Sequence, residues 1–363
     1  MSPFIYQQVF TGVTAAVAVV MAIERINSPD YKIQERGSSM WLPLAICFVL
    51  AFWIGFRPVS GAAFGDTANY ALEYINMDPH SVSMDWSGEW VWQLLMNGCK
   101  AAGFSLGLFF LIVAAGYIFS ALWAIKIFMP KDPMLGTVFL LASLMFFPFA
   151  VNGLRNGLAC HLVLLGAAFF LSDKWIPGAL VCLLAFGIHR SIMLPVVAIL
   201  FAIFVTRNVR YAIVFWFASI IISFFAGGVM SNFFAGLGFD DRMTQYITLD
   251  EMDQFSQVGF RWDFLIYSAA PIVMGWYICI YKQVSDNWYN VLVTVYCLCN
   301  AFWVMVIRSA FSNRFAYLSW FLYPIVIAYP LVNRKIREDQ DGFTGWILLA
   351  YAMFSVFMWF VIW

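Results

Sequence analysis

Carboxylates, an imidazole and several arginines lie at the ends of very apolar segments in this chain. Asp66 and Tyr70 are four residues apart, so on a helix they share one face. Arg57 precedes them in Gly55-Phe56-Arg57. An arginine fork suits phosphate, and a carboxylate can take a proton from a hydroxyl group. The alternative is structural, in which Arg57 reaches lipid headgroups and Asp66 only caps a helix.

Two further charged side chains interrupt apolar sequence. Glu89 stands beside Trp90 and Trp92 at the start of a stretch typical of an amphipathic interfacial helix, where it is either a sugar contact or a surface charge. Arg155 falls in the first turn of a helix expected from residue 154, where a cation opposes the helix dipole. A bound phosphate would remove that conflict, because helix N-termini bind anions. The alternative is that Arg155 ties helices together.

A histidine occupies a short turn between two apolar segments, in Gly187-Ile188-His189-Arg190-Ser191. A neighbouring cation favours the neutral imidazole, which can accept a proton or hydrogen-bond a substrate. We therefore consider His189 a candidate base and Arg190 a candidate substrate contact. A histidine satisfied by its protein neighbours is the equally weighted alternative.

Two later motifs repeat the combination of arginine and polar side chains. Arg261 and Asp263 either bind substrate or form an ion pair at the start of a helix. Arg308, Asn313 and Arg314 lie in a short turn between two apolar runs. Two arginines six residues apart are hard to explain there by lipid contact alone, so we expect them to bind substrate.

Composition places these residues in a membrane protein. The 363 residues are 63% hydrophobic and only 11% charged, against roughly a quarter charged in soluble domains. The net charge is zero, so no nucleic-acid partner is expected. Six of the seven cysteines fall in apolar runs and are expected to be small buried side chains, not a disulfide framework. No metal-ligand spacing is present, so we expect no metal and no cofactor.

Hydropathy divides the chain into about twelve spans of an all-α polytopic membrane protein, within a single integral membrane domain over residues 1–363. The closely spaced central segments are separated by Pro148, by Asn152-Gly153, by Asp173-Lys174 and by Gly187-Ile188-His189-Arg190. The expected spans are 4–23, 41–56, 105–127, 135–150, 154–172, 175–188, 191–206, 210–229, 262–281, 288–307, 314–332 and 344–363.

The connections between these spans set the expected orientation. Alternate connections hold twelve of the 20 basic residues, and by the positive-inside rule this set is cytoplasmic. Two longer loops, 57–104 and 230–261, then face the outside together with both termini. The outer set holds the remaining basic residues: Arg57, Lys100, Arg155, Arg190, Arg242, Arg261, Arg308 and Arg314.

The outer arginines indicate a pyrophosphate-bearing ligand near the outer membrane face. Arg57, Arg155, Arg190, Arg261, Arg308 and Arg314 are expected to converge on it. The inner turns are short and contain no Gly-rich nucleotide loop, so we expect an activated, lipid-carried substrate and not ATP to supply the energy.

Taken together, the motifs resemble the EpsG-type family of Wzy-like polysaccharide polymerases. The resemblance spans about residues 50–325 and depends on motif order. Its elements are Gly55-Phe-Arg57, Gly65-Asp66 with Tyr70, Glu89 with its aromatic neighbours, the Arg155 segment, His189 with Ser191, Gly259-Phe-Arg261-Trp-Asp263-Phe and Ser312-Asn313-Arg314.

The resemblance implies a GT-C-like glycosyltransferase in the bacterial inner membrane, with its active site facing the periplasm or outside. Such enzymes join undecaprenyl-diphosphate-linked oligosaccharides, which serve as donor and acceptor, without a metal. We expect the reaction to invert the anomeric carbon. A chain-length regulator and a flippase are the expected partners, besides the lipid bilayer.

Two other functions fit part of the pattern. A flippase or transporter of lipid-linked oligosaccharide would bind diphosphate without catalysis, but it should carry charges through the depth of the membrane. A membrane acyltransferase acting on polysaccharide would use His189 as its base, but it should show an acyl-donor path from the cytoplasm. The clustering of charge at one face favours the polymerase.

Overall fold

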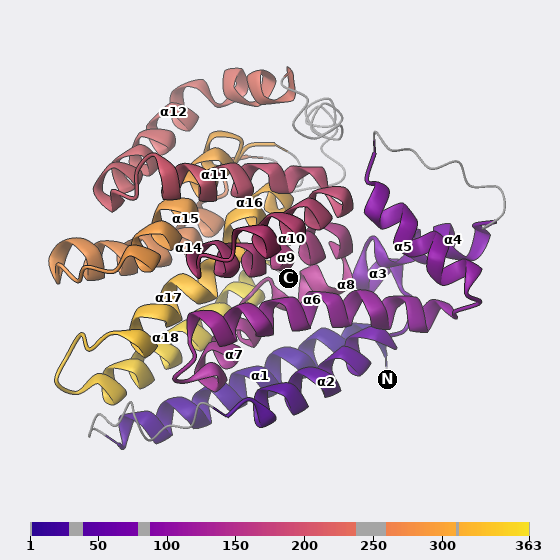
Figure 1. The fold of residues 1–363 in the computed structure, drawn as a ribbon, viewed down its shortest axis with the longest axis horizontal. Coiled ribbons are helices and arrows are strands. Elements are labelled where there is room, and N and C mark those ends of the chain that lie inside the picture. Colours follow the sequence, from indigo (N-terminus) through magenta and orange to yellow (C-terminus); the bar gives the residue numbers. More distant parts are fainter. Residues whose placement is uncertain (1, 29–38, 79–87, 237–258, 310–311, 363) are drawn as a thin grey trace. The chain divides into compact units, whose positions relative to one another are not determined.

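The computed structural model describes residues 2–28, 39–78, 88–236, 259–309 and 312–362, and the regular structure in these ranges is helical (Figure 1). The chain forms two compact units. Unit 1 comprises residues 1–189 and 328–363, and unit 2 comprises residues 190–327. Most of the second expected outer loop, 230–261, lies outside the described residues.

The first segment of unit 1, residues 1–189, contains α1 (Pro3–Ile26), α2 (Trp41–Gly55), α3 (Gly61–Phe64), α4 (Thr67–Asn76), α5 (Trp90–Ala101), α6 (Leu106–Phe128), α7 (Pro133–Leu141), α8 (Phe146–Val151), α9 (Leu154–Leu171) and α10 (Trp175–Ile188). Unit 2 contains η1 (Arg190–Ile192), α11 (Met193–Phe204), α12 (Val209–Gly236), α14 (Trp262–Gly275), the π-helix η3 (Trp276–Tyr281), α15 (Asn287–Met305) and α16 (Asn313–Trp320). The division falls within α17 (Tyr323–Asn333), and α18 (Gln340–Ile362) completes unit 1.

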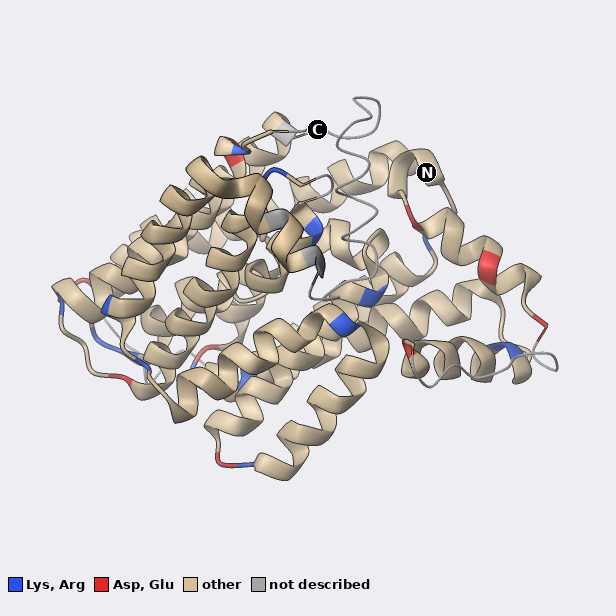
Figure 2. Ribbon diagram, turned by 90° about the horizontal axis from the view of Figure 1, so that it is seen from above, with Lys and Arg blue, Asp and Glu red and all other residues tan. Residues whose placement is uncertain are grey.

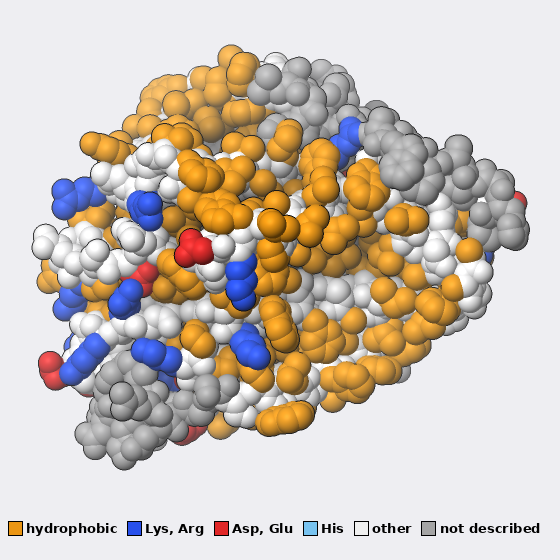
Figure 3. Space-filling model, viewed as in Figure 1, with side chains coloured by type: hydrophobic (Ala, Val, Ile, Leu, Met, Phe, Trp, Pro, Cys, Tyr) orange, Lys and Arg blue, Asp and Glu red, His pale blue; other side chains and the backbone are white. Residues whose placement is uncertain are grey.

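The chain is a multi-pass membrane protein. Eight helices in the described ranges are long and apolar enough to cross a bilayer, and three shorter apolar helices correspond to the expected segments 41–56, 175–188 and 191–206. Apolar side chains cover much of the face seen in Figure 3. Charged residues lie mostly at helix ends and in connections (Figure 2).

The expected continuous span 135–150 is instead two short helices, α7 and α8. The chain leaves the helical path over residues 142–145. Pro148, the third residue of α8, has no N–H group, and its ring would collide with the carbonyl four residues earlier in a continuous helix. Both short helices are almost fully buried, as irregular backbone at membrane depth requires.

Unit 1 is built on helix pairs. The central helix α9 packs against α6 and α10, α2 packs against α6, and the terminal helices α1 and α18 pack together. The first expected outer loop, 57–104, contains α3, α4 and α5. Helix α5 packs against α10 and buries Trp92, Met96 and Cys99 along one face.

Unit 2 is held together by apolar packing and a buried polar network. Helix α15 packs against α11, α12, α14 and α16. Asn300 on α15 accepts a 2.7 Å hydrogen bond from Trp216 Nε1 and donates a 2.9 Å bond to Ser319 Oγ. In a lipid-facing bundle, polar contacts of this kind hold helices in register. Helix α12 kinks at Ala226.

Candidate active site

Four of the side chains expected to act on substrate meet in unit 1: Tyr70, Glu89, Arg155 and His189. Glu89 is central, because its Oε2 pairs with Arg155 Nη1 and its Oε1 lies 2.5 Å from His189 Nδ1. Arg155 Nε donates a 3.1 Å hydrogen bond to the Tyr70 hydroxyl. The side chains of Glu89, Arg155 and His189 are between 12% and 19% exposed, so the cluster is largely shielded from solvent while still reachable.

Each member of this cluster stands at or near a helix end. Tyr70 is in the first turn of α4, Glu89 immediately precedes α5, Arg155 is the second residue of α9, and His189 immediately follows α10. Gly187 permits this arrangement, since a β-carbon there would lie 2.3 Å from Val91 on α5. A larger residue would push the start of α5, and Glu89 with it, away from His189.

The unfavourable position of the Arg155 cation at the start of a helix is compensated by a protein side chain, without a ligand. The carboxylate of Glu89 supplies the anion beside the first turn of α9. The dipole argument for a bound phosphate at Arg155 is therefore unnecessary, and its expected role toward diphosphate remains a prediction. The structure also rules out Glu89 as an isolated surface charge.

The contact between Glu89 and His189 has a chemical consequence. A neutral imidazole that donates its Nδ1 proton to the carboxylate keeps the lone pair on Nε2. The carboxylate fixes the ring orientation and would stabilise the imidazolium formed when Nε2 takes a proton. The pair can therefore serve as a general base for a hydroxyl group.

Arg57 is turned into the protein. Its guanidinium donates to the carbonyl of Ile54 at 2.9 Å, to Thr67 Oγ1 at 2.9 Å and to the carbonyl of Val151 at 3.3 Å, and it lies 4.4 Å from the Phe110 ring centroid. The residue is 4% exposed, so it does not reach lipid headgroups. Burial lowers the pKa of Arg57 to about 9, which leaves it charged at neutral pH. Its expected contact with phosphate remains a prediction.

Asp66 occupies the position before α4, but its side chain makes no capping hydrogen bond. Its backbone N–H donates to Asn152 Oδ1 at 2.8 Å, and its Oδ1 accepts from Asn69 Nδ2 at 3.3 Å. Asp66 is therefore not simply a helix cap. Gly65 allows this approach, since its φ is +51° and a β-carbon would lie 2.6 Å from Asn152 Oδ1.

Asn152 and Thr67 are important positioning residues that are absent from the expected site. Asn152 holds the backbone before α4, and Thr67 joins Arg57 to the carbonyl of Val151. The sequence feature that could have indicated a role for Asn152 is that this polar residue interrupts an apolar run. Through these contacts the break between α8 and α9, which directly precedes Arg155, also anchors the start of α4.

The remaining expected substrate contacts belong to unit 2. Arg261 and Asp263 form the ion pair considered as an alternative, with Nε–Oδ1 and Nη2–Oδ2 distances of 2.9 and 2.5 Å. The Arg261 guanidinium also lies 4.0 Å from the Phe264 ring centroid. An arginine held by a carboxylate in this fork geometry is rigidly oriented.

The other arginines of unit 2 differ in their surroundings. Arg308 is exposed and lies 5.8 Å from the Phe260 ring centroid. Asn313 and Arg314 begin α16 and are half-buried. Arg190 in η1 has a buried Nε without a hydrogen-bond partner among the described residues. The six arginines expected at one diphosphate thus divide into two in unit 1 and four in unit 2.

A family model, described as the EpsG family, matches residues 40–363. The chain belongs to the EpsG family. The match covers all the site residues described above and confirms the resemblance carried by the motifs. It makes this EpsG-family chain a membrane protein of polysaccharide biosynthesis. No curated protein and no solved structure matches the chain.

Proposed function

We propose that this EpsG-family protein is a Wzy-like glycosyltransferase that polymerises undecaprenyl-diphosphate-linked oligosaccharide repeat units. In this proposal it crosses the bacterial inner membrane about twelve times with a GT-C-like arrangement, and its active site faces outward. The reaction needs no metal and inverts the anomeric carbon. The proposal combines family membership with the multi-pass helical fold.

The single observation that carries the proposal is the Glu89–His189 pair joined to Arg155 and Tyr70. A flippase needs groups that bind its cargo, but it does not need an imidazole oriented by a carboxylate. A general base beside a cation is the minimum for transferring a sugar from a phosphate leaving group to a hydroxyl.

The bonds made and broken follow from this arrangement. His189 Nε2 takes the proton from a hydroxyl of the acceptor sugar as its oxygen attacks the anomeric carbon of the donor. The bond from that carbon to the lipid diphosphate breaks on the opposite face, and the diphosphate leaves with the electron pair. We assign the acceptor hydroxyl also to Asp66, which stands immediately before α4 and one helical turn before Tyr70.

The leaving group gains negative charge as the bond breaks, and arginines would stabilise that charge. In this proposal Arg57 and Arg155 assist from unit 1. Tyr70, Glu89 and Asp263 contact sugar hydroxyls. The diphosphate contacts from unit 2 are Arg190, Arg261, Arg308, Asn313 and Arg314.

The decisive test uses the purified protein with a defined lipid-diphosphate oligosaccharide, with and without a chelator, and mass spectrometry of the lipid-linked products. We expect longer glycans under both conditions, and none from His189→Ala. Lys100→Ala is the matched control, because Lys100 is also an expected outer basic residue, but its described contacts are to the carbonyl of Ile75 and the ring of Tyr74, outside the Glu89 cluster. Substrate binding without chain extension would favour a flippase, and extension by His189→Ala at the normal rate would contradict the assigned base.

A further inference from the structure

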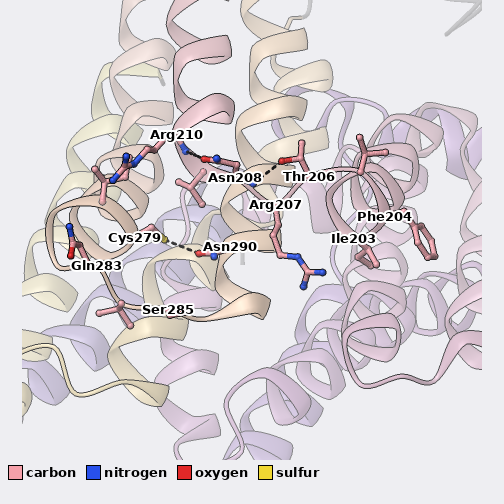
Figure 4. Close-up of a pocket in the computed structure, with 14 residues that line it drawn as sticks. Ile203, Phe204, Thr206, Arg207, Asn208, Arg210, Cys279, Gln283, Ser285 and Asn290 are labelled. Atoms are coloured by element: carbon pink, nitrogen blue, oxygen red, sulfur yellow. Dashed lines mark hydrogen bonds between the residues drawn. The ribbon is translucent and has the colours of Figure 1, made fainter.

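Unit 2 contains a polar cavity that the proposed transfer reaction does not use. It has a volume of about 660 Å³ and opens between the α11–α12 connection and the η3–α15 connection (Figure 4). Within unit 2 these are the opposite helix ends from those that carry Arg190, before α11, and Arg308, after α15. The cavity is therefore separate from the expected diphosphate contacts.

The charge of the cavity selects for anions. Arg207 and Arg210 extend to either side of Asn208 (Figure 4), and none of the fourteen lining residues is acidic. Neither guanidinium has an acidic partner among the residues that the structure describes. The nearby Asp286 is buried and accepts the backbone N–H of Tyr289, so it caps α15. Two exposed arginine forks that pair with no carboxylate of the described residues are suited to phosphate.

Polar groups other than the arginines also line the cavity. Thr206, Gln283, Ser285 and Asn290 contribute hydroxyl and amide groups. The first residues of α12 line the cavity as well. The N-terminal end of a helix carries a partial positive charge, which favours an anion. Phe204, which is 69% exposed, and the exposed Val205 add an apolar margin to the cavity wall. This combination of a phosphate-binding interior and an apolar margin matches a phospholipid headgroup with its chains.

The backbone at the wall is unusual. Residues Trp276–Tyr281 form a π-helix. This form is rare in proteins, and where it occurs it is often at a functional site. Gln283, two residues after the end of this helix, has a φ of +53°. Glycine fits this left-handed conformation with less strain, and the glutamine found here instead places an amide side chain at the cavity wall.

We propose that this cavity binds a phosphate-bearing ligand, which is either the headgroup of an anionic phospholipid or a free phosphate compound. Arg207 and Arg210 contact the phosphate, while Gln283 and Asn290 hydrogen-bond its remaining oxygens or an attached hydroxyl. The site is independent of the proposed polymerase activity and does not require it.

Native mass spectrometry of the full-length protein in detergent tests this site. Phosphatidylglycerol is one probe, diacylglycerol is the phosphate-free probe, and inorganic phosphate is the competitor. We expect a phosphatidylglycerol adduct that is at least about tenfold weaker in the double variant Arg207→Gln/Arg210→Gln, because each lost charge-assisted bond is worth more than a neutral one. Displacement by inorganic phosphate would identify a free phosphate ligand, whereas resistance to it would identify the lipid.

Two control variants make the result specific. Arg334→Gln/Arg337→Gln removes two basic residues near α17 and should leave the adduct unchanged. Gln283→Gly should weaken binding without loss of thermal stability, whereas Asp173→Gly, at a second left-handed non-glycine position among the described residues, should not affect binding. Equal adducts in both double variants, or equal binding of diacylglycerol, would overturn the proposal.

Discussion

At the residue scale, one carboxylate gives the candidate site its chemistry. The two carboxylate oxygens of Glu89 meet different side chains, those of Arg155 and His189. The sequence indicates which residue types are suited to substrate binding and proton transfer. It does not indicate that Glu89 would neutralise Arg155 and orient His189, because those residues are 66 and 100 positions away.

Replacement of Glu89 should affect turnover more than binding. We expect Glu89→Gln to lower kcat by about 100-fold or more, because the imidazole loses the carboxylate that orients it and stabilises its charged form. Glu89→Asp should recover part of this loss, since it restores the charge at a shorter reach. Steady-state kinetics with the lipid-linked donor measure both. A rise in KM with unchanged kcat would indicate that Glu89 serves only in binding.

Asp66→Asn separates chemistry from structure at the neighbouring position. Asparagine is as good as aspartate before a helix and retains the backbone N–H that bonds Asn152. We therefore expect an unchanged unfolding temperature and a loss of activity of about tenfold or more. Thermal unfolding, monitored by tryptophan fluorescence, measures the unfolding temperature, and polymer length measures the activity. Normal turnover would remove Asp66 from the proposed mechanism.

At the element scale, the site depends on short helices anchored to a break between longer ones. Helices α3 and α4 are too short to be stable alone. They are fixed because Arg57, Thr67 and the Asp66 backbone bind the carbonyl of Val151 and the side chain of Asn152. The interruption between α8 and α9 therefore positions residues on α4 as well as Arg155.

Two glycines with positive φ make a matched test of this anchoring. Gly65→Ala should destabilise unit 1 by about 3 kcal/mol or more, because it adds backbone strain and a clash with Asn152. Gly103→Ala should cost only about 1 kcal/mol, since its φ is +73° but a β-carbon there meets nothing within 4 Å. Unfolding temperatures of the two variants in the same detergent would show the difference. Equal losses would mean that the contact with Asn152 is not important.

At the scale of the whole molecule, the ends of the chain are joined within unit 1. Arg25 near the end of α1 pairs with Asp132, which caps α7, and with Asp341 at the start of α18. All three side chains are at most 15% exposed. Near lipid, charges of both signs remain buried only when they satisfy one another.

Breaking this triad should be costly. We expect Arg25→Gln to destabilise the protein by about 3–5 kcal/mol, because it removes a shared cation from two buried carboxylates. Lys335→Gln is the control, since its 3.4 Å pair with Glu338 is exposed and should contribute less than about 1 kcal/mol. Thermal unfolding of both variants is the measurement. Similar stabilities would show that the triad is not needed to join α1, α7 and α18.

The sequence by itself indicated the membrane class, the family and the place of most apolar segments, although the expected segment 314–332 is divided into α16 and α17. Hydropathy adds up along consecutive residues, so segments such as 154–172 and 175–188 could be located within a residue or two of α9 and α10. The break in 135–150 was missed because Pro148 can be tolerated early in a helix, and packing decides whether the preceding turn unwinds.

The tertiary structure alone decided which charged residues meet. Arg57 and Arg155 have similar positions at the ends of apolar segments. The structure buries Arg57 against backbone carbonyls, while it places Arg155 beside Glu89 and Tyr70. Tyr70 and Arg155 are 85 residues apart, and a contact over that separation depends on how α4 and α9 pack. A local sequence pattern does not report how distant helices pack. Arginines that look equivalent in the sequence can therefore have different surroundings in the folded protein.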